Sequence, residues 1–171
     1  LQDVVAFDSS AETFSTVLDL EQSTSRHVAV TISESCVLVH NHRCTDHVLL
    51  IQQETESSTP ILRKQPTTGF APSPRGLHAA CLLEAKKSLL VLCGAAQDGT
   101  ISNQVFKLNL ETWDWSQVKI VGREHPSPRA SPSCCVVDDS CLVMFGGAER
   151  TPEGGLKGCD DLWMLELLQE N

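Results

Sequence analysis

The chain has 171 residues, of which 41% are hydrophobic, and a formal net charge of −9 at neutral pH. This composition predicts a globular domain with a sizeable core and excludes a disordered chain. The negative charge argues against nucleic acid and anionic membrane surfaces as partners, because both need a basic footprint, and no apolar run is long enough to predict a membrane span.

Residues 1–20 predict two short strands. The apolar segment Asp3–Asp8 is followed by a turn and by Phe14 in a second strand. Phe14 stands six residues after an acidic residue, as Trp115 stands six residues after Asn109 further along the chain. We therefore expect residues 1–20 to be the last two strands of a repeating unit.

Residues 21–68 contain a weaker copy of the same unit. It begins at Arg26, and the apolar runs at residues 36–40 and 46–51 predict its second and third strands. We expect one degenerate unit in this part of the chain.

A stronger repeat follows. The Pro-Ser-Pro-Arg sequence of residues 72–75 recurs at residues 126–129. Each copy continues through an apolar strand, a turn and a second apolar strand that ends at Gly94 in one copy and at Gly146-Gly147 in the other. A polar loop and a third strand come next, and such self-similarity indicates a repeat architecture.

The two strong copies differ at their ends. The first continues to Trp115 and to a last strand at residues 116–120, whereas no such strand follows in the second. We therefore predict a complete unit at residues 69–122 and a unit lacking its fourth strand at residues 123–171.

The order of these features resembles that of kelch-repeat proteins over nearly the whole chain. The features are Arg75 with His78, the glycine pair Gly146-Gly147, and a tryptophan, Trp115, after an asparagine. Four short strands per unit, at a period of about 50 residues, are typical of a propeller blade. The resemblance implies an all-β fold, a kelch-type β-propeller fragment of four-stranded antiparallel blades.

Most of these residue types are expected to have structural roles. Trp115 is large enough to fill the gap between adjacent blades, and the glycine pair fits a crowded strand end or a positive φ. The guanidinium groups of Arg75 and Arg129 are expected to donate to backbone carbonyls of the next blade. The residues expected to be structural are Arg75, His78, Trp115, Arg129, Gly146, Gly147 and Trp163.

The predicted strands make about three blades, whereas known propellers close with four or more. A first and a last blade without neighbours would leave an open strand edge and an apolar face. We therefore expect the remainder of the propeller to come from the same or another polypeptide.

The chain has eight cysteines, most of them inside apolar stretches, where cysteine behaves as a small buried hydrophobe. We predict free thiols and a reducing compartment, which is the cytoplasm or the nucleus. The adjacent residues Cys134 and Cys135 are open to two interpretations, a strained vicinal disulfide or one buried and one exposed thiol on a strand.

One cluster contains metal-ligating residue types. On an extended strand, His40, His42 and Cys44 would point to one face, and His47 would follow around the turn. The alternative is a propeller loop in which Asn41-His42 replaces the glycine pair. Because the spacing matches no standard zinc finger, we predict no metal and keep these four residues as a weak zinc candidate.

No catalytic set is predicted. The acidic pairs Asp138-Asp139 and Asp160-Asp161 fit turn chemistry. Some kelch propellers are copper-radical oxidases, but that chemistry needs tyrosine and the chain has none. We expect no cofactor and no enzymatic activity in this chain.

The resemblance implies a protein-interaction module, because kelch propellers mostly recruit proteins, either as scaffolds or as substrate-recruiting parts of ubiquitin ligases. The alternative is an accessory propeller of a larger enzyme, such as a methyltransferase, whose catalytic residues lie elsewhere. Loops between strands form the binding faces of propellers. The residues predicted to contact a protein partner are Gln97, Asp98, Glu149, Arg150 and Lys157.

Overall fold

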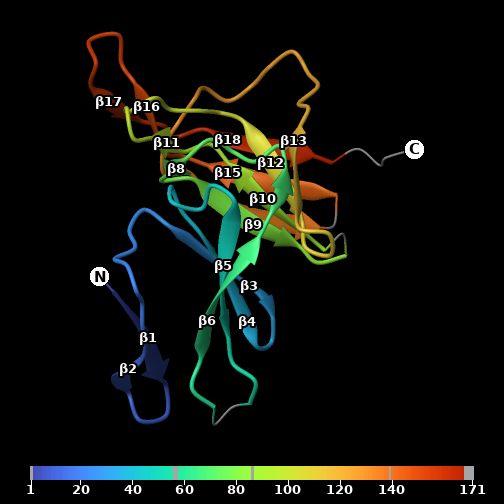
Figure 1. Ribbon diagram of the computed structural model, residues 1–171. Helices are drawn as coiled ribbons and strands as arrows, with labels where there is room; N and C mark the ends of the chain where they lie inside the picture. Colours follow the sequence, from blue (N-terminus) through green and yellow to red (C-terminus); the bar gives the residue numbers. More distant parts are fainter. Residues whose placement is uncertain (1, 56–57, 86, 139, 168–171) are drawn as a thin grey trace.

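The computed structural model describes residues 2–55, 58–85, 87–138 and 140–167. All secondary-structure elements in these ranges are β-strands, which confirms the predicted all-β fold (Figure 1). No helix in the described ranges is long and apolar enough to cross a membrane.

Four antiparallel sheets follow one another along the chain, and we propose that they are successive blades, here called blades I to IV. Blade I consists of β1 (Asp3–Asp8) and β2 (Thr13–Asp19). Blade II consists of β3 (Val28–Ser33), β4 (Cys36–His40), β5 (His47–Gln52) and β6 (Ile61–Pro66), in that order across the sheet. Blade III consists of β9 (Ala79–Leu83), β10 (Ser88–Leu92), β12 (Val105–Asn109) and β13 (Asp114–Val118). Blade IV consists of β14 (Ser133–Asp138), β15 (Cys141–Phe145) and β18 (Leu162–Glu166).

Shorter strands accompany the blades. The two-residue strand β7 (Thr68–Gly69) pairs in parallel with β13 at the outer edge of blade III. It spans the predicted boundary between residues 21–68 and 69–122. The other short strands form two pairs, β8 (Arg75–Gly76) with β11 (Ala95–Ala96), and β16 (Ala148–Arg150) with β17 (Leu156–Gly158).

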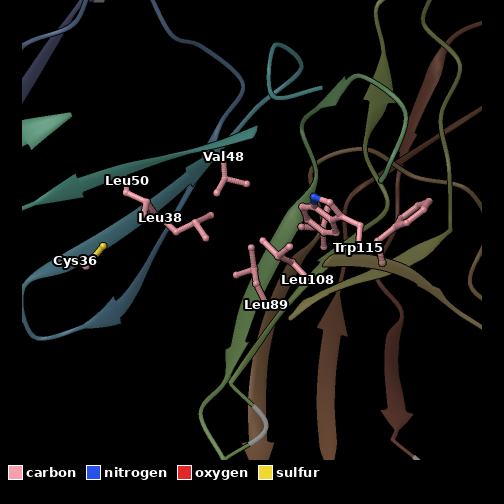
Figure 2. Packing of buried hydrophobic residues seen from close by; sticks show 9 residues of the cluster. Cys36, Leu38, Val48, Leu50, Leu89, Leu108 and Trp115 are labelled. Atoms are coloured by element: carbon pink, nitrogen blue, oxygen red, sulfur yellow. The ribbon is translucent and has the colours of Figure 1, made fainter. Parts of the chain in front are cut away.

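Blade III is buried on both faces, as its continuous apolar strands predict. One face carries Leu89 and Trp115 and packs against Leu38 and Leu50 of blade II (Figure 2). The other face carries Leu90 and packs against blade IV. Trp115 is only 3% exposed and belongs to the buried cluster that contains residues of both sheets.

The hairpin of blade I repeats the outer hairpin of blade III in detail. Asp8 Oδ1 accepts hydrogen bonds from the two backbone amides that begin its turn, as Asn109 Oδ1 does in blade III. Phe14 pairs with Phe7 as Trp115 pairs with Leu108. Phe14 is nonetheless 74% exposed, and Figure 1 shows the hairpin standing apart from the larger sheets.

A line of backbone hydrogen bonds joins blades II, III and IV just before their first strands. Arg26, Leu77 and Ser131 occupy the same position in each blade and have φ angles of 53°, 55° and 53°. The amide of Leu77 donates to the carbonyl of Arg26, and the amide of Ser131 donates to the carbonyl of Leu77. The repeated left-handed conformation therefore orients a donor and an acceptor toward neighbouring blades.

Candidate functional site

Two buried arginines fix the loops that leave the second strands of blades III and IV. Arg129 donates to Ser127 O at 3.1 Å, to Gly146 O at 3.0 Å and to Asp161 Oδ2 at 2.9 Å. Arg75 makes the equivalent bonds to the Ser73 and Cys93 carbonyls. All of these carbonyls lie in the arginine's own blade, so the expectation of bonds to the next blade was wrong.

The acceptor that completes each network differs between the two blades. In blade III it is the neutral amide of Gln104, 3.0 Å from Arg75 Nη2. In blade IV it is the carboxylate of Asp161, which also accepts from the Trp163 indole. Hydrogen bonds from Arg129 and Trp163 lower the pKa of Asp161 below its ordinary range. The sequence predicted only a turn residue at Asp161 and assigned no role to Gln104.

The glycine pair satisfies both conditions that the sequence suggested. Gly146 and Gly147 have φ angles of 66° and 91°. A Cβ atom on Gly147 would lie 2.8 Å from the carbonyl oxygen of Ala130, which is closer than van der Waals contact allows. The chain between β15 and the β16–β17 hairpin therefore takes a backbone conformation that glycine adopts readily and other residues rarely do.

The loops that follow β10 and β15, together with residues 127–128, border a shared and wide-open cavity of about 640 Å³. Arg150 joins them, because its Nη2 and Nε donate to Gly99 O at 2.7 and 3.1 Å. The cavity, here called the loop pocket, is lined by Asp98, Gly99, Thr100, Ile101, Ser127, Pro128, Glu149 and Arg150.

The loop pocket gathers three of the residues predicted to contact a partner. Asp98, Glu149 and Arg150 line it. Gln97 is exposed beside it but is not among the lining residues, and Lys157 lies across β16–β17 from Glu149. Asp98 also shapes its own loop, because its carboxylate accepts a hydrogen bond from the Thr100 amide, which lowers its pKa. The pocket thus presents two carboxylates and one guanidinium on short tethered loops.

The four residues of the zinc candidate do not converge. Residues 41–44 form a turn, with the Cys44 amide bonded to Asn41 O, in place of the expected extended strand. His47 Nδ1 contacts the Asp46 carboxylate, whereas buried Cys44 lies near Val39 O. No group of three or more potential ligands lies within reach of one metal ion in the described ranges. His42 follows Asn41 at the point where Gly146-Gly147 follows β15, which favours the alternative interpretation.

His40 instead forms an unexpected pair with His78. The two rings lie between blades II and III, where His40 Nδ1 is 3.0 Å from His78 Nε2 and both residues are buried. The other ring nitrogens, His40 Nε2 and His78 Nδ1, are buried without a hydrogen-bond partner. Burial lowers the pKa of His40 to about 3 and that of His78 to about 4, with the nearby Arg75 charge adding to both shifts.

We expect this histidine pair to make the protein sensitive to mild acid. Both pKa values are lower in the folded chain than the ordinary 6.5, so the unfolded chain binds more protons below pH 6.5. Stability should therefore fall as the pH drops from about 6.5 to about 4, by at most about 1.4 kcal/mol per pH unit for each ring. Urea unfolding at several pH values measures this slope.

The matched variant is His40→Leu combined with His78→Leu, because Leu92 occupies the position of His40 in blade III. The double variant should lose most of the slope between pH 6.5 and 4. An unchanged slope would show that other groups cause the acid sensitivity.

The adjacent cysteines follow the strand alternation. Cys134 packs toward blade III, whereas Cys135 is exposed, and all eight cysteines are free thiols. Cys134 is half-buried rather than fully buried, and the vicinal disulfide is not formed. Burial raises the pKa of Cys93 to about 11, which makes that thiol a poor nucleophile.

Comparison with known proteins agrees with this architecture. Residues 27–171 match the KLHDC2/KLHL20/DRC7 Kelch-repeats domain. The chain belongs to this kelch-repeat family. The matched region begins at the first strand of blade II and includes all of blades II to IV, so the resemblance predicted from the sequence is confirmed.

Several relatives share part of the chain. Kelch domain-containing protein 2 of Bos taurus is 35% identical over 109 residues, which are 63% of this chain and 25% of that protein. Dynein regulatory complex subunit 7 of Chlamydomonas reinhardtii is 34% identical over 48% of this chain and 7% of its own length. Host cell factor of Drosophila melanogaster is 31% identical over 67% of this chain and 8% of its own length. The chain thus spans a quarter or less of these curated relatives.

The solved structure of YjhT, a kelch propeller, matches with a TM-score of 0.65 and 18% identity. The match covers 94% of this chain and 48% of YjhT. At this identity the likeness shows the fold alone, and it confirms the predicted kelch-type propeller fragment.

Proposed function

We propose that the chain is a protein-interaction module that holds a protein partner at the loop pocket, as a scaffolding or substrate-recruiting part of a larger protein. The observation that carries the proposal is the meeting of Asp98, Glu149 and Arg150, from two blades, around one cavity. Side chains from separate blades gain a fixed geometry because the buried networks of Arg75 and Arg129 hold the loop bases.

The chemistry of the pocket favours binding over catalysis. Its ionisable groups are exposed or half-buried. The pKa of Asp98 is lowered mainly by a hydrogen bond within its own loop, from the backbone amide of Thr100. Catalytic acids and bases usually have pKa values displaced by burial and by neighbouring charges. Of the two acidic pairs, Asp161 is engaged by Arg129 and Asp138 accepts from the Ser140 amide, whereas Asp139 lies outside the described residues.

A charge reversal at the pocket tests the proposal. We expect Glu149→Lys to weaken partner binding at least about tenfold, because a removed or reversed contact at the centre of an interface costs more than about 1.4 kcal/mol. Affinity capture of the full-length protein, followed by quantitative mass spectrometry, identifies the partners. Titration of each captured partner against the purified chain measures the change.

The matched control is Glu34→Lys, which makes the same charge change in the exposed turn between β3 and β4. That turn lies at the opposite end of the strands from the loop pocket. Partners lost with Glu149→Lys and retained with Glu34→Lys support the proposal. Partners that bind both variants equally contradict it.

A further inference from the structure

Blades III and IV each contribute one thiol to the contact between them. Cys81 lies on β9 and Cys134 lies on β14, the first strands of the two blades, and these strands approach each other to within 8 Å between Cα atoms. Both side chains belong to the apolar cluster between blades III and IV. We call Cys81 and Cys134 the thiol pair.

The repeat places the two thiols opposite each other. Counted from the left-handed residue that precedes each first strand, Cys81 and Val30 are both the fourth residue, and Cys134 and Ala80 are both the third. Val30 and Ala80 pack in the apolar cluster between blades II and III. The thiol pair therefore occupies, one blade further along the chain, the positions of two side chains that meet between blades.

The two thiols are close enough to share a hydrogen bond. The Cys134 thiol donates to the Cys81 sulfur, which lowers the pKa of Cys81 below its ordinary value. The same contact, together with burial, raises the pKa of Cys134. A thiolate therefore forms more readily at Cys81 while a protonated thiol stays beside it, which is the arrangement of an attacking and a resolving cysteine.

Neighbouring thiols are less suited to react with this pair. Cys93 lies in the same cluster, but its Sγ contacts Met144 Sδ at 3.6 Å, and burial raises its pKa to about 11. Cys135 is exposed, but it points to the opposite face of β14 from Cys134, because successive side chains alternate along a strand. The packing thus favours a cross-link between Cys81 and Cys134.

We propose that Cys81 and Cys134 are a redox-modification site, at which hydrogen peroxide produces a disulfide that joins blade III to blade IV. This site is separate from the loop pocket and does not depend on the function proposed there. Disulfides inside cells are usually transient, so the cross-link should form under peroxide and be removed by thiol reductants.

The reaction has two steps. The Cys81 thiolate attacks the peroxide, so that an S–O bond forms, the O–O bond breaks, and the leaving hydroxide takes up a proton to become water. The Cys134 sulfur then attacks the sulfur of the Cys81 sulfenic acid. The S–S bond forms, the S–O bond breaks, and the leaving hydroxide takes the Cys134 proton as a second water. The two sulfurs together lose the two electrons that the peroxide oxygens gain.

The cross-link should stabilise the protein measurably. It would close a loop through residues 82–133, and a disulfide that closes a long loop strongly constrains the unfolded chain. We therefore expect oxidation to raise Tm by about 5–15 °C. Hydrogen exchange should become slower in β9 and β14, because the two strands can then no longer separate.

Peptide mapping of the purified protein tests the proposal. The protein is treated with hydrogen peroxide, its remaining thiols are blocked, and it is digested with trypsin without reductant. Trypsin leaves Cys81 in the peptide of residues 76–86 and Cys134 in the peptide of residues 130–150. We expect a disulfide between these two peptides that dithiothreitol removes. Because Cys135 and Cys141 share the second peptide, the double variant Cys135→Ser with Cys141→Ser should form the same cross-link.

Two further variants examine the roles within the thiol pair. Cys134→Ala should stop the reaction at the Cys81 sulfenic acid, which dimedone labels. The matched control is Cys81→Val combined with Cys134→Ala, which copies the pair Val30 and Ala80 into blades III and IV. This control should fold as the parent does, as circular dichroism can check, and peroxide should no longer raise its Tm.

Four results would overturn the inference. They are a peroxide-induced disulfide that joins other cysteines, a Cys134→Ala chain that dimedone does not label at Cys81, and a cross-linked protein that melts no higher than the reduced protein. The fourth is a cross-link that forms only in urea, since the folded chain would then not bring the two thiols together.

Discussion

Replacing Trp115 by alanine should destabilise the protein by about 3–5 kcal/mol, the range for removing a buried aromatic side chain and leaving a cavity. Trp115 is 3% exposed and belongs to the buried cluster that contains apolar side chains of both blade II and blade III (Figure 2). It also lies against the His40 ring, with 5.5 Å between the ring centroids. Urea unfolding, followed by circular dichroism, measures the loss.

Hydrogen exchange in the two blades distinguishes a residue that joins them from a residue that only packs in the core of its own blade. Because Trp115 belongs to blade III but covers blade II, hydrogen exchange should increase in β4 and β5 as well as in β12 and β13. Trp115→Phe is the matched control and should lose less stability, since a smaller aromatic ring still occupies the gap. Faster exchange confined to blade III would contradict the role between blades.

The sequence predicted the fold well because its information was periodic. A repeated order of arginine, glycine pair and tryptophan specifies strands and their connections, even in blade II, where Asn41-His42 stands in place of the glycines. Phe14 was matched to Trp115 from spacing alone, and the structure gives both residues the same turn and the same cross-strand pairing. Its 74% exposure depends on which blade lies opposite and not on the sequence of the hairpin itself.

The candidate sites were less predictable because they depend on contacts between separate blades. Asp98 and Arg150 are 52 positions apart, and only the packing of blades III and IV brings them around one pocket. The pairing of His40 with His78 likewise joins two blades. The repeat places Asp161 at the position of Gln104, and this correspondence was visible in the sequence. Whether Asp161 is a turn residue or the partner of Arg129 can be decided only from the side-chain geometry.

Replacing Arg129 by alanine should destabilise the protein by about 2–4 kcal/mol, because its buried guanidinium satisfies several acceptors that water cannot all reach. The Arg129 side chain is 1% exposed, whereas that of its partner Asp161 is 40% exposed. Because water can partly hydrate the Asp161 carboxylate, the loss of stability should be smaller than for a fully buried ion pair. The carbonyl of Gly146 would lose its Arg129 donor, so the β16–β17 loop should exchange faster. Thermal unfolding and hydrogen exchange measure both effects.

The chain contains its own control for the charge in this network, because Gln104 takes the place of Asp161 beside Arg75. Asp161→Gln should keep a hydrogen-bond acceptor for Arg129 and cost only about 1 kcal/mol at neutral pH. The bonds from Arg129 lower the Asp161 pKa in the folded chain, so its contribution is present above about pH 4 and is lost as the pH falls further. The glutamine variant should lack that part of the acid sensitivity. If Asp161→Gln were as damaging as Arg129→Ala at neutral pH, the ionic contact itself, and not the satisfaction of buried acceptors, would hold the loop.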